Sequence, residues 1–162
     1  MRLTTCLWFD GNAREAAEFY VSIFPNSSLG SNWVTPAETP GNQLGDEVVV
    51  DFLIFGQPFI GLNGGSQFKF NEAISFQIPC ANQDEIDNFW ELLAQDGGQP
   101  GQCGWIKDKF GVSWQVLSPL MEQYIGGPDR DGASAATQAM LNMTKLNIEA
   151  LRLAYESART VE

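Results

Sequence analysis

The chain has 162 residues, 44% of them hydrophobic and 12% aromatic, so it is long enough for one domain with a buried core and too apolar for a disordered protein. Twenty acidic residues against nine basic ones give a formal net charge of −11, which argues against nucleic acid or an anionic membrane as partner. Histidine is absent, which removes the commonest general base and every metal site that needs imidazole.

The three cysteines do not have the pattern of a disulfide framework or a zinc ribbon. Cys6, Cys80 and Cys103 are odd in number and far apart in the chain. The N-terminal stretch has no basic end followed by a long apolar core, and no apolar run approaches the roughly 18 residues of a membrane span. We therefore expect a protein of the reducing cytoplasm, without a secretory signal or a membrane span.

The first part of the chain predicts a strand over residues 3–9 and then a helix. Asn12 and Glu15 have the spacing of a helix N-cap with its capping box. Apolar residues follow at the spacing of one buried helix face, namely Ala16, Phe19, Tyr20 and Ile23. Pro25 is expected to end this helix.

The same pattern recurs seventy residues later. A second strand is predicted over residues 74–79, and Asn82 with Glu85 repeats the capping box. The apolar face recurs as Ile86, Phe89, Trp90 and Leu93, and a Gly-Gly pair at 97–98 is expected to end the helix. Because cap, box and four apolar positions share one offset, we interpret the chain as two tandem copies of one β-α unit.

Further strands are predicted after each helix. They lie at about 27–34, 47–55 and 58–63 in the first copy, and at about 99–103, 104–107 and 112–117 in the second. A loop rich in proline and glycine covers residues 36–45. The predicted fold class is therefore α+β, with the order β-α-β-β-β repeated over residues 1–66 and 70–120.

From residue 121 the character of the chain changes. Residues 126–128 form a Gly-Gly-Pro break, and a helical segment is predicted from about 132 to 155. Asn147 is expected to cap a second, separate helix within that segment. We thus expect a domain of residues 1–120 followed by a helical C-terminal arm over residues 121–162.

Five segments have the character of one known family, namely LWFDGNAREAAEFYVSIFPNS, FGQPFIGLNGG, FKFNEAISFQIPC, CGWIKDKFGVSWQVLSP and, in the arm, QAMLNMTKLNIEAL. They resemble the PhnB-like family, whose domain is often named for demethylubiquinone methyltransferase. This family belongs to the vicinal oxygen chelate superfamily, which includes glyoxalase I, extradiol dioxygenases and bleomycin-resistance proteins. The resemblance implies two half-barrel sheets that form a cupped, barrel-like sheet with a cleft, in a homodimer.

The resemblance also implies positions for a metal site, because metalloenzymes of the superfamily carry one ligand in each of four strands. By position these ligands fall on Thr5, Ser75 and Gln115, and by a looser alignment on Ile60. Two hydroxyls, an amide and an alkyl group offer no anionic or imidazole ligand to a divalent ion. We therefore expect no metal ion, and no other cofactor is indicated.

Strand alternation predicts which side chains line the implied cleft. Thr5, Leu7 and Phe9 are expected to face it, with Cys6 and Trp8 turned to the helices. In the second copy Ser75, Gln77, Gln115 and Leu117 are expected to face it, with Trp114 and Val116 turned away. The predicted ligand-binding set is Thr5, Leu7, Ile60, Ser75, Gln77, Trp105 and Gln115. The alternative is that these side chains fill a closed barrel.

Two residues are weak candidates for catalysis. Cys103 is the only plausible nucleophile, but with no histidine to accept its proton an inert thiol is the expected outcome. Lys107 lies in a predicted hairpin, either as part of a paired surface turn or as a cation for an anionic group of a ligand.

These patterns favour a metal-independent protein that binds a small molecule in its cleft. One alternative is an enzyme of the same family, either a methyltransferase or an isomerase or lyase that uses Lys107 or Cys103. A second alternative is a structural or regulatory dimer whose cleft is filled. The expected partners are a small-molecule ligand and a second copy of the chain, with no nucleic acid and no membrane.

Overall fold

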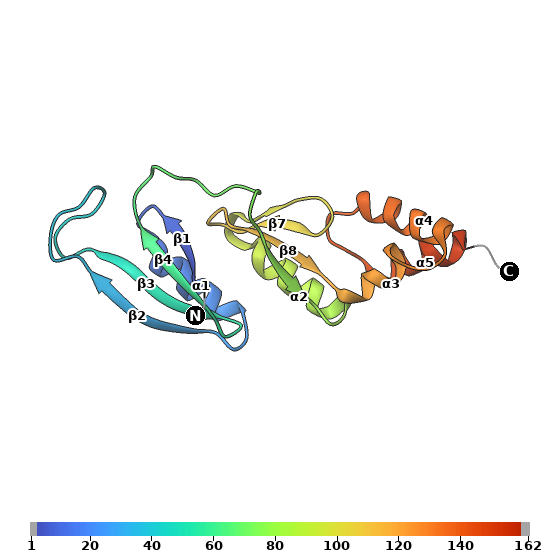
Figure 1. The fold of residues 1–162 in the computed structure, drawn as a ribbon, viewed down its shortest axis with the longest axis horizontal. Coiled ribbons are helices and arrows are strands. Elements are labelled where there is room, and N and C mark those ends of the chain that lie inside the picture. The colour runs from blue at the N-terminus through green and yellow to red at the C-terminus, as the bar shows by residue number, and fades with distance from the viewer. Residues whose placement is uncertain (1–2, 160–162) are drawn as a thin grey trace. The chain divides into compact units, whose positions relative to one another are not determined.

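The computed structural model describes residues 3–159, and its backbone contacts divide the chain into two compact units, one ending at Phe70 and the next beginning at Asn71 (Figure 1). The elements of the first unit are β1 (Thr5–Phe9), α1 (Ala13–Ile23), β2 (Ser28–Val34), β3 (Glu47–Ile54) and β4 (Gln57–Asn63). Its strands form one sheet in the order β1-β4-β3-β2, in which β1 and β4 are parallel and the other neighbours antiparallel.

The second unit repeats this arrangement and adds the arm. It contains β5 (Phe76–Pro79), α2 (Gln83–Ala94), β6 (Gln99–Pro100), β7 (Trp105–Lys107), β8 (Ser113–Leu117), α3 (Glu122–Ile125), α4 (Arg130–Leu141) and α5 (Ile148–Ala158), with short 3-10 turns at Gln95–Gly97 and Pro119–Met121. Its sheet has the order β5-β8-β7-β6, with β5 parallel to β8. The predicted tandem β-α-β-β-β order and the α+β class are confirmed. The strands of residues 3–159 form two four-stranded sheets and no closed barrel.

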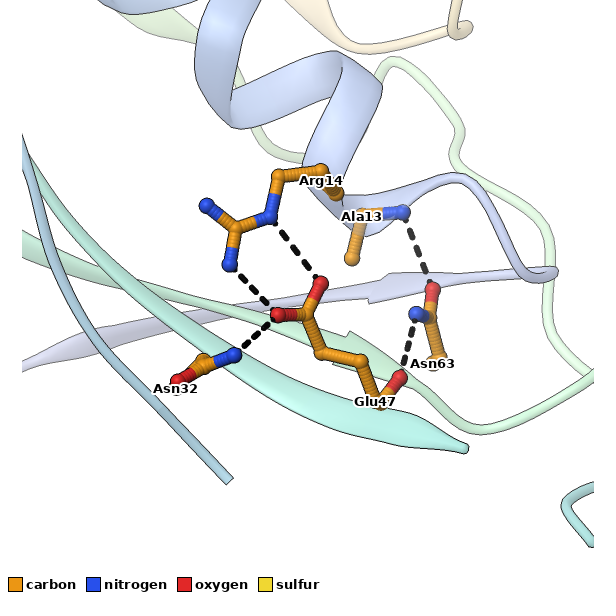
Figure 2. A network of polar contacts seen from close by, with 5 residues as sticks. All are labelled: Ala13, Arg14, Asn32, Glu47 and Asn63. Atoms are coloured by element: carbon orange, nitrogen blue, oxygen red, sulfur yellow. Dashed lines mark hydrogen bonds and ion pairs between the residues drawn. The ribbon is translucent and has the colours of Figure 1, made fainter. Parts of the chain in front are cut away.

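The first turn of α1 is held by the sheet beneath it. Asn12 occupies the N-cap position, as predicted, but its side chain makes no capping hydrogen bond. The Ala13 amide instead donates to Oδ1 of Asn63 over 2.9 Å, and Nδ2 of Asn63 donates to the carbonyl of Glu47, also over 2.9 Å (Figure 2). One buried amide of β4 thus joins the start of the helix to the start of β3.

An ion pair reinforces this junction. Arg14 donates to both carboxylate oxygens of Glu47, over 3.0 Å from Nε and 2.5 Å from Nη2, and Asn32 of β2 donates to the same carboxylate (Figure 2). The hydrogen bond from Arg14 holds the pKa of Glu47 below its ordinary value. The cluster connects α1, β2 and β3 at one end of the sheet.

The second helix follows its sequence prediction closely. Oδ1 of Asn82 accepts a hydrogen bond from the Glu85 amide over 2.9 Å, and the Glu85 carboxylate accepts one from the Ala81 amide over 2.8 Å. The predicted apolar face is buried, with Ile86, Phe89, Trp90 and Leu93 all inaccessible or nearly so. In α1 the buried face is instead made of Ala13, Ala16, Ala17 and Tyr20, because small side chains let that helix lie close to its sheet.

The arm consists mainly of α4 and α5, and it is connected to the rest of the second unit by apolar contacts and hydrogen bonds. Asn147 caps α5, as predicted, with its Oδ1 accepting from the Ala150 amide over 2.8 Å. Met121, Leu146 and Leu151 form an apolar cluster within the arm, and Leu117 of β8 packs against it. Gln83 at the start of α2 connects to the arm twice, donating to the Leu146 carbonyl over 3.0 Å and accepting from the Ile148 amide over 2.9 Å. Within residues 3–159, every helix falls short of the length and apolar character that a membrane crossing would require.

Candidate functional site

The faces of the first sheet are fixed by a glycine in β4. A Cβ atom on Gly61 would lie 3.1 Å from the Cβ of Ala13, so this position faces α1. Gly61 pairs with Leu7, and Ile60 pairs with Cys6. Because paired residues of neighbouring strands point to the same side of a sheet, Leu7 faces α1, and Cys6 and Ile60 face away from it.

The predicted facing of the first strand is therefore reversed. Thr5, Leu7 and Phe9 lie on the side of α1, where Leu7 and Phe9 are only 6% and 3% exposed, while Cys6 and Trp8 occupy the opposite side. Thr5 and Ile60 consequently sit on opposite faces of one sheet. Alternation shows which residues of β1 share a side, but it does not show which side is buried. The close approach of α1 to β4 determines the buried side.

In the second sheet Gln77 and Gln115 lie on one side and Trp114 and Val116 on the other, as predicted, but Leu117, which was expected to face the cleft, packs against the apolar cluster of the arm. Trp114 and Val116 are buried on the side of the sheet that packs against α2. The opposite side carries Gln77, Trp105, Lys107, Ser113 and Gln115, which we call the polar face. These five neighbouring positions from three strands include the candidates Gln77, Trp105, Lys107 and Gln115, and Ser75, just before β5, contacts them through Gln115.

The polar face holds a connected group of neutral polar side chains. Gln115 pairs in register with Gln77 on one side and with Trp105 on the other. Its Nε2 atom donates to Oγ of Ser75 over 2.7 Å, and its Oε1 atom accepts from Nε2 of Gln77 over 3.4 Å. The predicted residues Ser75, Gln77 and Gln115 therefore form one hydrogen-bonded group beside an indole ring.

A pocket of about 190 Å³ opens at one end of the polar face. It is lined by Glu72, Gln99, Pro100, Gly101, Trp105, Ile106, Lys107 and Ser113. The Lys107 ammonium forms an ion pair with the Glu72 carboxylate, and the hydrogen bond from Lys107 lowers the pKa of Glu72. Ser113 is 2% exposed, and among residues 3–159 its Oγ is the one buried side-chain nitrogen or oxygen without a hydrogen-bond partner.

The turn between β7 and β8 is held by a buried carboxylate. Oδ1 of Asp108 accepts from the amides of Phe110 and Val112 over 2.9 and 3.0 Å, and Oδ2 accepts from Nε1 of Trp114 over 2.8 Å. Asp108 is 2% exposed, so the interpretation of this segment as a plain surface turn missed its role. By closing the turn, Asp108 sets Lys107 and Ser113 opposite each other in adjacent strands.

Cys103 lies outside the polar face. It precedes β7 at the end of the strand opposite Lys107, and its backbone amide donates to the Met143 carbonyl over 2.8 Å. Its Sγ atom points to the Met140 carbonyl at 3.6 Å. The structure therefore sets Cys103 against the arm, apart from the group around Gln115.

The metal site that the superfamily implies does not fit these residues. Ser75 and Gln115 bond to each other, Thr5 and Ile60 lie on opposite faces of their sheet, and none of the four side chains is anionic. Within residues 3–159, no three acidic or cysteine side chains gather closely enough to hold a metal ion.

Residues 1–117 match the protein-family model described as 3-demethylubiquinone-9 3-methyltransferase. The chain belongs to this family. The match covers both copies of the β-α-β-β-β unit and ends with β8, before the arm. No curated protein matches the chain.

One solved structure agrees with this membership in the 3-demethylubiquinone-9 3-methyltransferase family, and two further structures share the fold. A PhnB protein from Bacillus cereus of the same description is 34% identical, with a TM-score of 0.64 over 73% of this chain and 100% of that one. A Pseudomonas aeruginosa protein is 17% identical, with a TM-score of 0.59 over 73% and 98% of the two chains. The fosfomycin resistance protein FosX from Listeria monocytogenes is 17% identical, with a TM-score of 0.52 over 76% and 94%. The likeness to these last two is one of fold, whereas the family match and the Bacillus cereus structure confirm the predicted PhnB-like family.

Proposed function

We propose that this member of the 3-demethylubiquinone-9 3-methyltransferase family binds a small organic molecule on the polar face of its second sheet, without a metal ion. The observation that carries the proposal is the group formed by Ser75, Gln77 and Gln115 beside Trp105. Small-molecule sites combine an apolar or aromatic surface with a few placed polar groups, and the polar face has this composition. The pocket beside Trp105 provides a concave surface next to that group.

The neutral chemistry of the group supports binding by hydrogen bonds and contact with an aromatic ring. An amide offers both a donor and an acceptor, and a serine hydroxyl does the same. Such groups orient a ligand but supply no strong general base and no charged metal ligand. We therefore assign no metal-dependent step to this site, and the predicted positions Thr5, Leu7 and Ile60 of the first sheet stay outside the proposal.

Native mass spectrometry of the protein as purified from cells tests this function. We expect a stoichiometric organic molecule on the unmodified protein, lost in Gln115→Leu, because the variant removes the amide at the centre of the group. The matched control is Gln123→Leu, an exposed side chain on α3, which should retain the molecule. Retention by Gln115→Leu, or a tightly bound metal ion in protein purified without added metal, would contradict the proposal.

We further propose that the protein acts as a cytoplasmic homodimer. The edge strand β2 is exposed along its whole length, with Trp33 48% and Val34 46% exposed, and natural proteins usually cover such edges. The three cysteines are free thiols, the form that a reducing compartment maintains. The same mass spectra report the number of copies, and a monomer at micromolar concentration would contradict the dimer.

A further inference from the structure

The pocket at the end of the polar face is built from three neighbouring strands. Gln99 of β6 pairs with Lys107 of β7, and Lys107 pairs with Ser113 of β8. Their side chains therefore form one row across the sheet, with Trp105 in the next row. All four residues line the pocket of about 190 Å³.

The Ser113 hydroxyl is the first sign that this pocket takes a ligand. Ser113 is one of the residues that line the pocket, and its hydroxyl is buried and has no hydrogen-bond partner in the structure. A buried hydroxyl without a partner loses its bonds to water and gains none in return, so natural proteins rarely leave one. An oxygen atom of a bound molecule would supply the missing partner.

The ion pair at the mouth of the pocket indicates what kind of oxygen this is. The carboxylate on Lys107 comes from Glu72, whose side chain is 59% exposed and also lines the pocket. An exposed pair of this kind contributes little stability, because water screens both charges. The ammonium of Lys107 thus already holds a carboxylate at the pocket, on a side chain that can move aside at small cost.

We propose that the pocket binds the carboxylate of a small organic acid, with Lys107 and Ser113 as donors and Glu72 as an internal substitute when the ligand is absent. The proposal rests on the proposed function, since it names the chemical class of the ligand on the polar face. One carboxylate oxygen replaces the Glu72 oxygen on Lys107, and the second accepts from the Ser113 hydroxyl. A ring attached to the carboxylate then lies against the Trp105 indole.

Because the chain as a whole is acidic, Lys107 should determine whether the pocket prefers an acid to a neutral molecule. A formal net charge of −11 repels anions, so an acid binds only where a local cation outweighs that repulsion. A neutral amide of the same shape could accept from Ser113 but could not displace the Glu72 carboxylate. The pocket should therefore distinguish an acid from its amide, and the distinction should disappear with the Lys107 charge.

Benzoate and benzamide make a matched pair of probes for the full-length protein. We expect benzoate to shift the amide signals of Lys107 and Ser113 and the indole signal of Trp105 saturably in 1H-15N NMR spectra. Benzamide should bind about tenfold more weakly. Glu72→Gln should strengthen benzoate binding severalfold, because it removes the competing charge. Ser113→Ala should weaken benzoate binding about fivefold.

Lys107→Met tests the role of the cation, and Lys109→Met is its matched control. Lys109 is two residues away, lies over the Phe110 ring and pairs with Asp96, so its loss should leave the preference for benzoate unchanged. Lys107→Met should abolish the preference. Three results would overturn the carboxylate assignment: equal binding of benzoate and benzamide, a preference for benzoate that persists in Lys107→Met, or no saturable shift with benzoate. A neutral molecule that native mass spectrometry finds on the unmodified protein but not on Gln115→Leu would do so as well while leaving the proposed function intact.

Discussion

Two buried polar side chains set the positions of their neighbours at the scale of single residues. Asn63 joins the start of α1 to β3, and Asp108 gathers three N–H groups around the turn that precedes β8. Asn63 satisfies one backbone donor and one backbone acceptor, and Asp108 satisfies three donors, which would otherwise lack these partners. Substitution of either residue therefore removes more than its own contact.

Asp108→Ala is expected to destabilise the protein by about 3 kcal/mol, because it leaves three N–H groups, one of them the buried Trp114 indole, without an acceptor. Urea unfolding followed by tryptophan fluorescence measures the change. The exposed Asp10 provides the control, since Asp10→Ala should change the free energy of unfolding by less than about 0.5 kcal/mol. A loss for Asp108→Ala no larger than that of the control would show that the carboxylate does not hold the turn.

Glu47→Gln should lower stability in a way that depends on pH. The pKa of Glu47 is lowered in the folded protein, so its charge stabilises the fold above the ordinary glutamate pKa of about 4.3 and ceases to do so as the pH falls through the folded value. With Arg14 partly exposed and screened, we expect a loss of about 1 kcal/mol at neutral pH. The free energy of unfolding of Glu47→Gln, measured at neutral and acidic pH, checks this loss. Glu91→Gln, at an exposed site, is the control. A loss that grows as the pH falls would contradict the assignment.

Cys80 is expected to resist alkylation in the folded protein. It is fully buried, and burial raises its thiol pKa to about 12, so only about one thiol in ten thousand is ionised at pH 8. The exposed Cys6 serves as the internal comparison and should react first with iodoacetamide. Mass spectrometry of peptides labelled with and without urea measures both rates. Equal labelling of Cys6 and Cys80 without urea would be the contrary result.

At the scale of elements, the sequence predicted the order of helices and strands better than the side to which the residues of a strand point. Asn82 and Asn147 signalled their helices correctly, because a cap is a local interaction between residues three positions apart. The facing of β1 could not be obtained locally, since it depends on Gly61 some fifty residues further along the chain. Asp129, which caps α4 through the Gly132 amide over 2.7 Å, was recognisable as a cap residue by its type and was missed.

The proposed boundary at residue 120 separates a domain from its arm, and Gln83 tests how firmly the two are joined. Gln83→Ala removes the hydrogen bonds to the Leu146 carbonyl and the Ile148 amide, and it should destabilise the junction by about 1–2 kcal/mol. Hydrogen exchange should be faster at the Ile148 amide and in α5. The exposed Gln138 on α4 gives the matched control, as Gln138→Ala should leave exchange in α5 unchanged. Unchanged exchange at Ile148 in Gln83→Ala would contradict this role.

At the scale of the whole molecule, the excess of acidic residues acts on stability. A formal net charge of −11 makes the folded chain repel itself, and salt screens that repulsion over about 10 Å at 0.1 M. We expect thermal unfolding to shift upward by several degrees between roughly 10 and 150 mM NaCl. Sucrose at matching osmolality serves as the neutral comparison. A midpoint that falls with added NaCl would show that ion pairs such as Arg14–Glu47 outweigh the repulsion.

Family and scaffold were recognisable from the sequence because the motifs extend over both repeats, and residues 1–117 do match the family. That Ser75, Gln77 and Gln115 lie on one side was also predicted, since it follows from alternation within two strands, whereas the hydrogen bonds between them were not. Lys107 was considered as a cation for an anionic group of a ligand, but the pocket that surrounds it was not predicted. It requires the register of three strands and the burial of Ser113, which depend on long-range pairing rather than on local pattern.

The strand order has a consequence for how the protein is made. In each sheet the strand that is synthesised first has a single neighbour, the strand synthesised last: Thr5 pairs with Phe59, and Phe76 pairs with Trp114. Neither sheet can be completed before its last strand has left the ribosome, and until then β1 and β5 have no strand neighbour. The first unit can complete its own sheet while the second is still being translated, so the two equivalent sets of strands become available for pairing at different times.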